Sequence, residues 1–176
     1  MNYNEYRDEA FATARRNGFH EEECSVEHLK CLIISEMMEA VEADRLAHYA
    51  DFKGYLDARW NMPYEENFGQ NIKDTVEDEL ADVCIRIFDL AGYKNIDLNE
   101  AMQKVTDNIY PSGTFTEKIY RAVRVLAVRE PLAVSLARTL TRILKIAEQE
   151  DIDIETHIQL KMDYNKGRKY KHGKKY

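Results

Sequence analysis

Two short acidic motifs are the part of this sequence best suited to chemistry. Glu36 and Glu39 lie three residues apart in one predicted helix, and Glu79 and Asp82 have the same spacing in another. Residues three apart share one face of a helix, so each motif directs two carboxylates toward one point. Antiparallel packing of the two helices would bring four carboxylates together. Such a group, without histidine or cysteine, is typical of a site for Mg²⁺, with Mn²⁺ as an alternative.

The apolar pattern predicts that these acids face the interior. At 100° per residue around the first helix, Glu36 lies within the apolar arc and Glu39 at its edge. On the second helix, Glu79 and Asp82 follow one flank of the apolar stripe. Clustered buried carboxylates are costly unless a cation neutralises them. The chain has 32 Asp and Glu, so accidental acidic pairs on a solvated surface are the alternative interpretation.

Other kinds of active site have less support. A di-iron site in a helical bundle needs Glu-x-x-His pairs, and none of the five histidines follows a glutamate at that spacing. P-loop, dinucleotide-binding and nucleophile-elbow motifs are absent from the sequence. Three cysteines without C-x-x-C spacing favour neither a disulfide framework nor zinc. With no signal-peptide pattern and no long apolar run, we expect an unprocessed cytoplasmic protein without a membrane span.

Charge is distributed unevenly along the chain. The net charge is −7, but residues 161–176 contain seven Lys or Arg and one Asp, so this tail carries +6 and the other 160 residues carry −13. An acidic body with a basic tail suggests an anionic ligand held near bound cations. A solvated, disordered end is the alternative.

The residues around the acidic motifs resemble a known family, the MazG-like all-α nucleoside triphosphate pyrophosphohydrolases, which are related to dimeric dUTPases and to phosphoribosyl-ATP pyrophosphohydrolase. The family signature, E-x-x-E followed after a spacer by E-x-x-D, is matched by LIISEMMEAVEADR and VEDELADVCIRIFDLA. The ending HIQLKMDYNKGRKYKHGKKY resembles the K-x-x-x-N-x-x-R tail of a subset of members. The resemblance covers about residues 25–50, 74–110 and 150–176.

This resemblance implies a reaction and a set of site residues. The expected activity is hydrolysis of a ribo- or deoxyribonucleoside triphosphate between the α and β phosphates, which gives a monophosphate and pyrophosphate. The expected ligands of Mg²⁺ are Glu36, Glu39, Glu79 and Asp82. The expected substrate contacts are Lys161, Asn165, Arg168, Lys169 and Lys174. A homo-oligomer, either a dimer or a tetramer, is also implied. We further predict that Glu39, at the edge of the apolar arc, acts as the catalytic general base.

The elements that must position these residues are predicted to be helices throughout. Only 7 Gly and 3 Pro interrupt a chain whose apolar residues recur at three- and four-residue steps, which predicts an all-α bundle. The expected helices cover about residues 4–16, 25–49, 74–91, 97–109, 116–129, 132–148 and 153–166. The predicted terminal signals are Gly18 and Gly92 as stops, Ser25 as an N-cap, and a capping-box-like pair of Asp97 and Glu100. We expect one domain over residues 1–176, with the basic tail at its end.

The segment of residues 51–71 is the expected long loop or broken helix, since it contains Gly54, Pro63 and Gly69. Its aromatic residues Trp60, Tyr64 and Phe68 could stack on a nucleobase, but packing within the loop is the favoured interpretation.

An internal similarity at an offset of 56 residues suggests a degenerate second helical hairpin. The matching pairs are Leu80-Ala81 with Leu136-Ala137, Arg86-Ile87 with Arg142-Ile143, Ala91 with Ala147, and Ile96-Asp97 with Ile152-Asp153. Duplication and chance both remain open. In the second copy Ser135 replaces Glu79 and Arg138 replaces Asp82, so only the first copy would carry chemistry.

Two functions of other classes compete with the enzyme. The first is a non-catalytic helical module that binds a nucleotide or a protein partner. Because all four acids are present, we favour the enzyme over this module. The second is nucleic-acid binding through the basic tail, which ranks last because the acidic body would repel a duplex.

Overall fold

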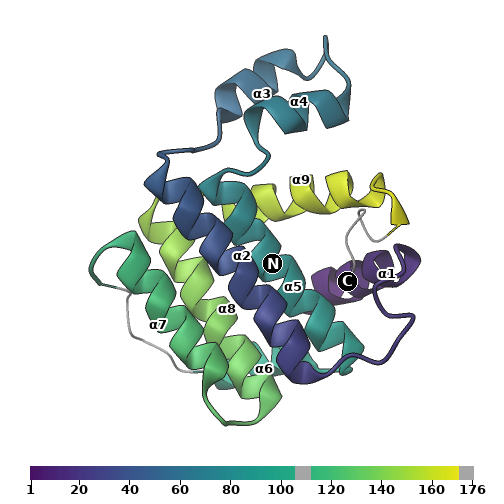
Figure 1. Ribbon diagram of the computed structural model, residues 1–176, viewed down its shortest axis with the longest axis vertical. Helices are drawn as coiled ribbons and strands as arrows, with labels where there is room; N and C mark the ends of the chain where they lie inside the picture. Colours follow the sequence, from purple (N-terminus) through teal and green to yellow (C-terminus); the bar gives the residue numbers. More distant parts are fainter. Residues whose placement is uncertain (106–111, 171–176) are drawn as a thin grey trace.

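The computed structural model describes residues 1–105 and 112–170, and within them every regular element is a helix (Figure 1). The helices of this part of the chain are α1 (Tyr3–Arg16), α2 (Val26–Arg45), α3 (Phe52–Ala58), α4 (Tyr64–Asn71), α5 (Val76–Tyr93), α6 (Leu98–Lys104), α7 (Phe115–Ala127), α8 (Leu132–Gln149) and α9 (Ile154–Lys166). The all-α prediction is confirmed. No helix in the described residues has both the length and the apolar character needed to cross a bilayer.

Helix α5 is the central element of the bundle. It packs against α1, α2, α8 and α9, and α7 covers the outer side of α2 and α8 (Figure 1). Its apolar residues are buried around most of the helix, which is the pattern of a helix enclosed by others. The fully buried ones are Leu80, Ala81, Val83, Cys84, Ile87, Phe88, Leu90 and Ala91. Residues of α5 therefore face several neighbouring helices at once, and this places its acids between α2 and α9.

Helices α3 and α4 form a hairpin that lies above α9 in Figure 1 and packs against it. The alternative of a broken helix for residues 51–71 is thus confirmed. Phe68 is fully buried and stacks on Tyr164 of α9 with ring centroids 4.4 Å apart, and the Tyr64 hydroxyl donates to the Leu160 carbonyl at 2.5 Å. Packing is therefore the role of these two aromatic rings. Trp60, at the tip, is 80% exposed.

Helix ends follow the predicted signals in part. Gly18, with φ +85°, follows α1, and the Ser25 side chain caps α2 by accepting from the His28 backbone N–H. The Asp97 side chain accepts from the Glu100 N–H at 2.8 Å, which is half of the expected reciprocal pair. A complete capping box is found instead at Thr114, before α7.

Three predicted helix ends are wrong. The predicted stop at Gly92 lies inside α5, where a side chain would collide with Phe11 of α1, so this glycine permits close helix packing. Asn95, with φ 50°, makes the turn instead. Helix α2 ends at Arg45, short of the predicted residue 49, because Ala47 adopts a left-handed conformation with φ 52°. Helix α6 ends at Lys104, and residues 106–109 of the predicted helix lie outside the described residues.

Candidate metal and anion site

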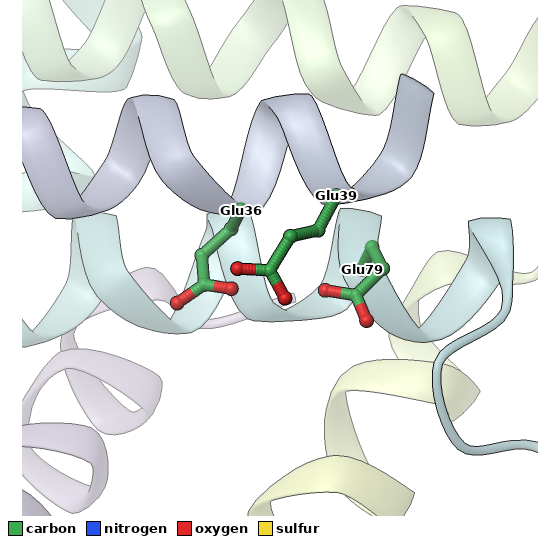
Figure 2. A group of neighbouring side chains, drawn as sticks. All are labelled: Glu36, Glu39 and Glu79. Atoms are coloured by element: carbon green, nitrogen blue, oxygen red, sulfur yellow. The ribbon is translucent and has the colours of Figure 1, made fainter. Parts of the chain in front are cut away.

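Three of the four predicted acids converge between α2 and α5. Glu36 and Glu39 extend from α2 toward Glu79 on α5, as Figure 2 shows, and each offers an oxygen within 4.8 Å of the others. Ile33 and Met37 of α2 are fully buried, and Glu36 lies buried on this apolar side of the helix, whereas Glu39 lies exposed at its edge. The three-residue spacing within one helix and the packing of two helices thus produce the predicted carboxylate cluster.

Glu79 is the least satisfied of these acids. Its residue is 4% exposed, and Oε2 has no hydrogen-bond partner among the described residues. Burial, followed by the nearby Asp82 carboxylate, raises the pKa of Glu79 to about 8. A buried oxygen without a donor, in a cluster of carboxylates, is what a bound cation would satisfy. The donor set therefore fits a divalent ion with oxygen ligands.

Glu36 and Glu39 occupy different environments. Glu36 is buried and accepts a hydrogen bond from Arg86 Nε at 2.9 Å. Burial raises the pKa of Glu36 and the Asp82 carboxylate adds to this, while Arg86 opposes both. Glu39 is exposed, and its Oε1 accepts from the Ser35 hydroxyl at 3.3 Å. Glu39 is consequently the carboxylate of the cluster that solvent reaches most easily.

Asp82 lies outside this group of three and is held by Lys161 of α9. The Lys161 ammonium is 2.8 Å from Asp82 Oδ2 and 2.6 Å from Asp78 Oδ2. Lys161 is only 3% exposed, and Asp78 is fully buried. Burial alone would lower the pKa of Lys161, but the two aspartates raise it well above its ordinary value. The lysine predicted to contact the nucleotide thus serves as the counter-ion of two acids on α5.

Asp78 is a site residue that the sequence interpretation missed. It accepts from Lys161 and from the Asp74 N–H at 3.0 Å, while Oδ1 has no partner among the described residues. Burial raises its pKa to about 6, against the opposing effect of Lys161. Asp74, Asp78 and Glu79 form a second group of acids with neighbouring oxygens. Only the position of α9 identifies Asp78 as part of the site, and no local pattern gives that position.

A pocket encloses the acids, with walls from α1, α2, α5 and α9. The predicted residues that line it are Glu36, Glu39, Glu79, Asp82, Lys161, Asn165 and Arg168. Helix α1, which had no predicted role, contributes Ala10, Thr13 and Ala14. Lys169 is exposed and does not line this pocket, and Lys174 lies outside the described residues.

The cations of the pocket differ in how they are paired. Lys73 pairs with Asp74, Arg86 with Glu36, and Lys161 with the two aspartates of α5. Arg168 has no carboxylate partner among the described residues, and its guanidinium lies 5.9 Å from the centre of the Tyr164 ring. Nearby, the buried Asn165 Oδ1 also has no hydrogen-bond partner in that part of the chain. The pocket thus combines an acidic group with a cation that is available to an anion.

A pair formed by His20 and Asp89 borders the same pocket, and the sequence did not predict it. His20 Nε2 is 2.7 Å from Asp89 Oδ1, and Asp89 lines the pocket. The His20 ring stacks on Tyr93 with centroids 4.8 Å apart. His20 lies in an acidic segment between helices, without a motif that could have indicated this contact.

Comparisons of the chain with protein-family models, with curated proteins and with solved structures found no match.

Proposed function

We propose that this chain is a Mg²⁺-dependent nucleoside triphosphate pyrophosphohydrolase of MazG-like type, which converts a ribo- or deoxyribonucleoside triphosphate to the monophosphate and pyrophosphate. The observation that carries the proposal is the content of one pocket. Three carboxylates converge there within 4.8 Å, and the same pocket contains Arg168, which has no carboxylate partner among residues 1–105 and 112–170. A metal–triphosphate complex needs both features, since its cation requires oxygen ligands and its phosphates require a positive charge.

Glu36, Glu39 and Glu79 are the residues that would hold Mg²⁺, or Mn²⁺ in its place. Glu79 Oε2, which is buried and has no hydrogen-bond partner among the residues that the structure describes, supports this assignment. Bound there, the ion would offset the charge of the phosphates and lower the pKa of a coordinated water. Asp82 stays a predicted fourth ligand, although its carboxylate is paired with Lys161.

The remaining chemistry is assigned to side chains of the chain itself. Glu39 is exposed, and within the described part of the chain its side chain accepts a single hydrogen bond, at 3.3 Å from Ser35, so it can accept a proton from an attacking water. Arg168 offers a planar guanidinium that can donate two hydrogen bonds to one phosphate. Lys161 acts by fixing Asp78 and Asp82 rather than by contacting phosphate, because its ammonium is buried between them.

Pyrophosphate release from a panel of ribo-, deoxy- and modified nucleoside triphosphates tests the proposal. We expect release with Mg²⁺ or Mn²⁺, none with chelator, and none from Glu79→Gln. Release that persists in chelator, or equally from the variant, would contradict the metal site. No release from any member of the panel by the folded wild type would contradict the enzyme.

A specific observation also favours the non-catalytic binding module as a second candidate. Arg86 and Lys161 already neutralise two of the four predicted ligands, Glu36 and Asp82. A protein that binds a nucleotide without turnover could retain these pairs permanently. Calorimetric titration with a triphosphate distinguishes the two, because binding at full stoichiometry without pyrophosphate release would favour the module.

The proposal includes a homo-oligomer, a dimer or a tetramer, because the family resemblance implies one. Sedimentation equilibrium would test it, and a monomer at all concentrations would contradict it.

A further inference from the structure

The residues that follow α9, up to Tyr170, lie beside the end of α1 and the loop after it (Figure 1). Asn17 Nδ2 donates to the Asn165 carbonyl at 3.2 Å, and Lys166 Nζ lies 2.7 Å from Glu9 Oε1 on α1. Tyr170 then donates its hydroxyl hydrogen to Glu21. These contacts connect the C-terminal end of α9 to α1 and to the loop after it.

The ring of Tyr170 packs against Gly18. Its φ of +85° is a conformation that residues with a side chain rarely adopt. A Cβ built at this position would also collide with the Tyr170 ring. The ring therefore occupies the space that the absence of a side chain provides, so Gly18 has a packing role besides its backbone role.

Arg168 lies between the two anchors of this segment, Lys166 and Tyr170, and it lines the pocket. Residues outside regular helices are usually mobile unless a contact fixes them, and Arg168 follows the end of α9. A phosphate-binding arginine on a mobile segment would have to be ordered each time a ligand binds, which weakens binding. The anchors remove part of that cost before the ligand arrives.

We propose that residues 166–170 form a strap that Tyr170 fastens to Gly18 and Glu21, so that Arg168 is held ready for the phosphate chain of the ligand. The inference rests on the proposed function and adds a positioning residue to it. Tyr170 does not touch the phosphates and acts through Arg168. Its side chain should therefore affect the affinity for phosphates and leave the chemical step unchanged.

The docking of the strap is tested without any ligand. Trypsin needs an extended chain around the bond it cuts, and the Lys166 ammonium is paired with Glu9 while the strap is docked, so the rate of cutting after Lys166 reports how often the segment opens. We expect Tyr170→Ala to be cut about tenfold faster than wild type, with an unchanged helical circular dichroism signal. The matched control is Tyr120→Ala, which removes a 63% exposed tyrosine from α7 and should be cut at the wild-type rate.

The effect on affinity is tested by calorimetric titration with inorganic pyrophosphate in the presence of Mg²⁺. Loss of one charge-assisted contact predicts about tenfold weaker binding for Arg168→Ala and for Tyr170→Ala. If Tyr170 acts only through Arg168, the double variant should bind no more weakly than Arg168→Ala alone. Gly18→Ala, which displaces the ring, should reproduce the effect of Tyr170→Ala.

These measurements test the strap independently of whether the protein hydrolyses a triphosphate. Equal cleavage rates in wild type and Tyr170→Ala would overturn the strap, as would additive effects in the double variant or a wild type that does not bind pyrophosphate. If the wild type binds pyrophosphate with non-additive variants but releases none from any triphosphate, the strap stands and the proposed hydrolysis fails. Where hydrolysis occurs, Tyr170→Ala should raise KM about tenfold and leave kcat within twofold.

Discussion

Adding 56 to the residue numbers of the first and last residues of α5 gives those of α8. Adding 56 to the first residue of α6 likewise gives the first residue of α9. The turns after the two long helices correspond as well, since Asn95 and Asp151 both have positive φ values, of 50° and 58°. The apolar positions that both helices bury completely are Leu80 and Leu136, Ala81 and Ala137, Cys84 and Leu140, Ile87 and Ile143, Leu90 and Ile146, and Ala91 and Ala147. The similarity found in the sequence at an offset of 56 residues is thus also present in the helix bounds, turns and buried positions of the two segments.

The polar residues of the two helices differ. Ser135 occupies the position equivalent to Glu79, and its buried hydroxyl donates to the Leu126 carbonyl at 3.2 Å. Glu79 is equally enclosed, but its Oε2 has no partner in the described residues. The α8 segment shows that this packing does not need a carboxylate there. The acids of α5 therefore impose a cost on the fold, as residues retained for binding or catalysis do.

Replacing Glu79 with glutamine removes the buried carboxylate that distinguishes α5 from α8. Of the changes considered, it should have the largest effect on activity. The variant keeps the shape of the side chain but loses a metal-binding oxygen and the negative charge. We expect pyrophosphate release to fall about a thousandfold, which corresponds to about 4 kcal/mol in the barrier. Steady-state kinetics at saturating Mg²⁺, with circular dichroism as a check of folding, measures this.

The control for Glu79→Gln is a variant in α8. Arg138 in α8 is equivalent to Asp82 in α5 and pairs with Glu130 at 3.1 Å. Arg138→Gln should leave turnover within twofold of wild type. A comparable loss in both variants would mean that activity depends on general stability rather than on the acids of α5.

Breaking the buried ion pairs of Lys161 should have the next largest effect, on stability. Lys161→Met leaves the buried Asp78 carboxylate without its counter-ion. We expect the free energy of unfolding to fall by about 3 kcal/mol, as measured by urea denaturation.

The comparison supplies a compensating change for this variant, because the residue equivalent to Asp78 in α8 is Val134. Adding Asp78→Val to Lys161→Met should recover most of the lost stability. If the double variant is no more stable than the single one, the Asp78 pair is not the cause of the loss.

The pH dependence of stability provides a smaller effect. Without metal, the folded state holds the Glu79 proton with a pKa of about 8, against an ordinary value of 4.5. The folded state therefore binds more protons than the unfolded chain between these values, and stability falls as the pH rises through this window. Relative to Glu79→Gln, the melting temperature of wild type should fall by several degrees from pH 5 to pH 8.

Addition of Mg²⁺ should reverse this trend at pH 8, since the ion binds the deprotonated carboxylate. A wild type and a Glu79→Gln variant with parallel melting curves over the whole pH range would show that Glu79 titrates normally.

The sequence predicted those parts of the fold and site that depend on local pattern. The apolar periods predicted α1, α7, α8 and α9 to within two residues at each end, and the arc around Ile33 placed Glu36 inside. The pairing of Asp82 with Lys161 joins residues 79 positions apart, so it depends on how α9 packs, which no local pattern encodes. The turn at Ala47 was missed because alanine carries no signal for a left-handed conformation.

The connection from α2 to α5 also differs from the one between α7 and α8. Replacing the exposed tryptophan in this connection should have the smallest effect on stability and activity. Helices α3 and α4 lie in this connection, whereas α7 and α8 are joined by residues 128–131 alone. Trp60 is exposed at the tip, with Arg59 4.9 Å from its ring centre, and it does not line the pocket. Trp60→Ala should change the free energy of unfolding by less than about 0.5 kcal/mol and leave KM within twofold.

Phe68→Ala is the matched comparison for Trp60→Ala within the hairpin. This change removes a fully buried ring that stacks on Tyr164, and we expect a loss of about 3 kcal/mol. A Trp60→Ala variant with unchanged stability but a KM raised more than fivefold would instead show that the tip closes over the nucleobase. In that case the hairpin would belong to the site, and the contrast between the α5 and α8 halves would include substrate recognition as well as the acids.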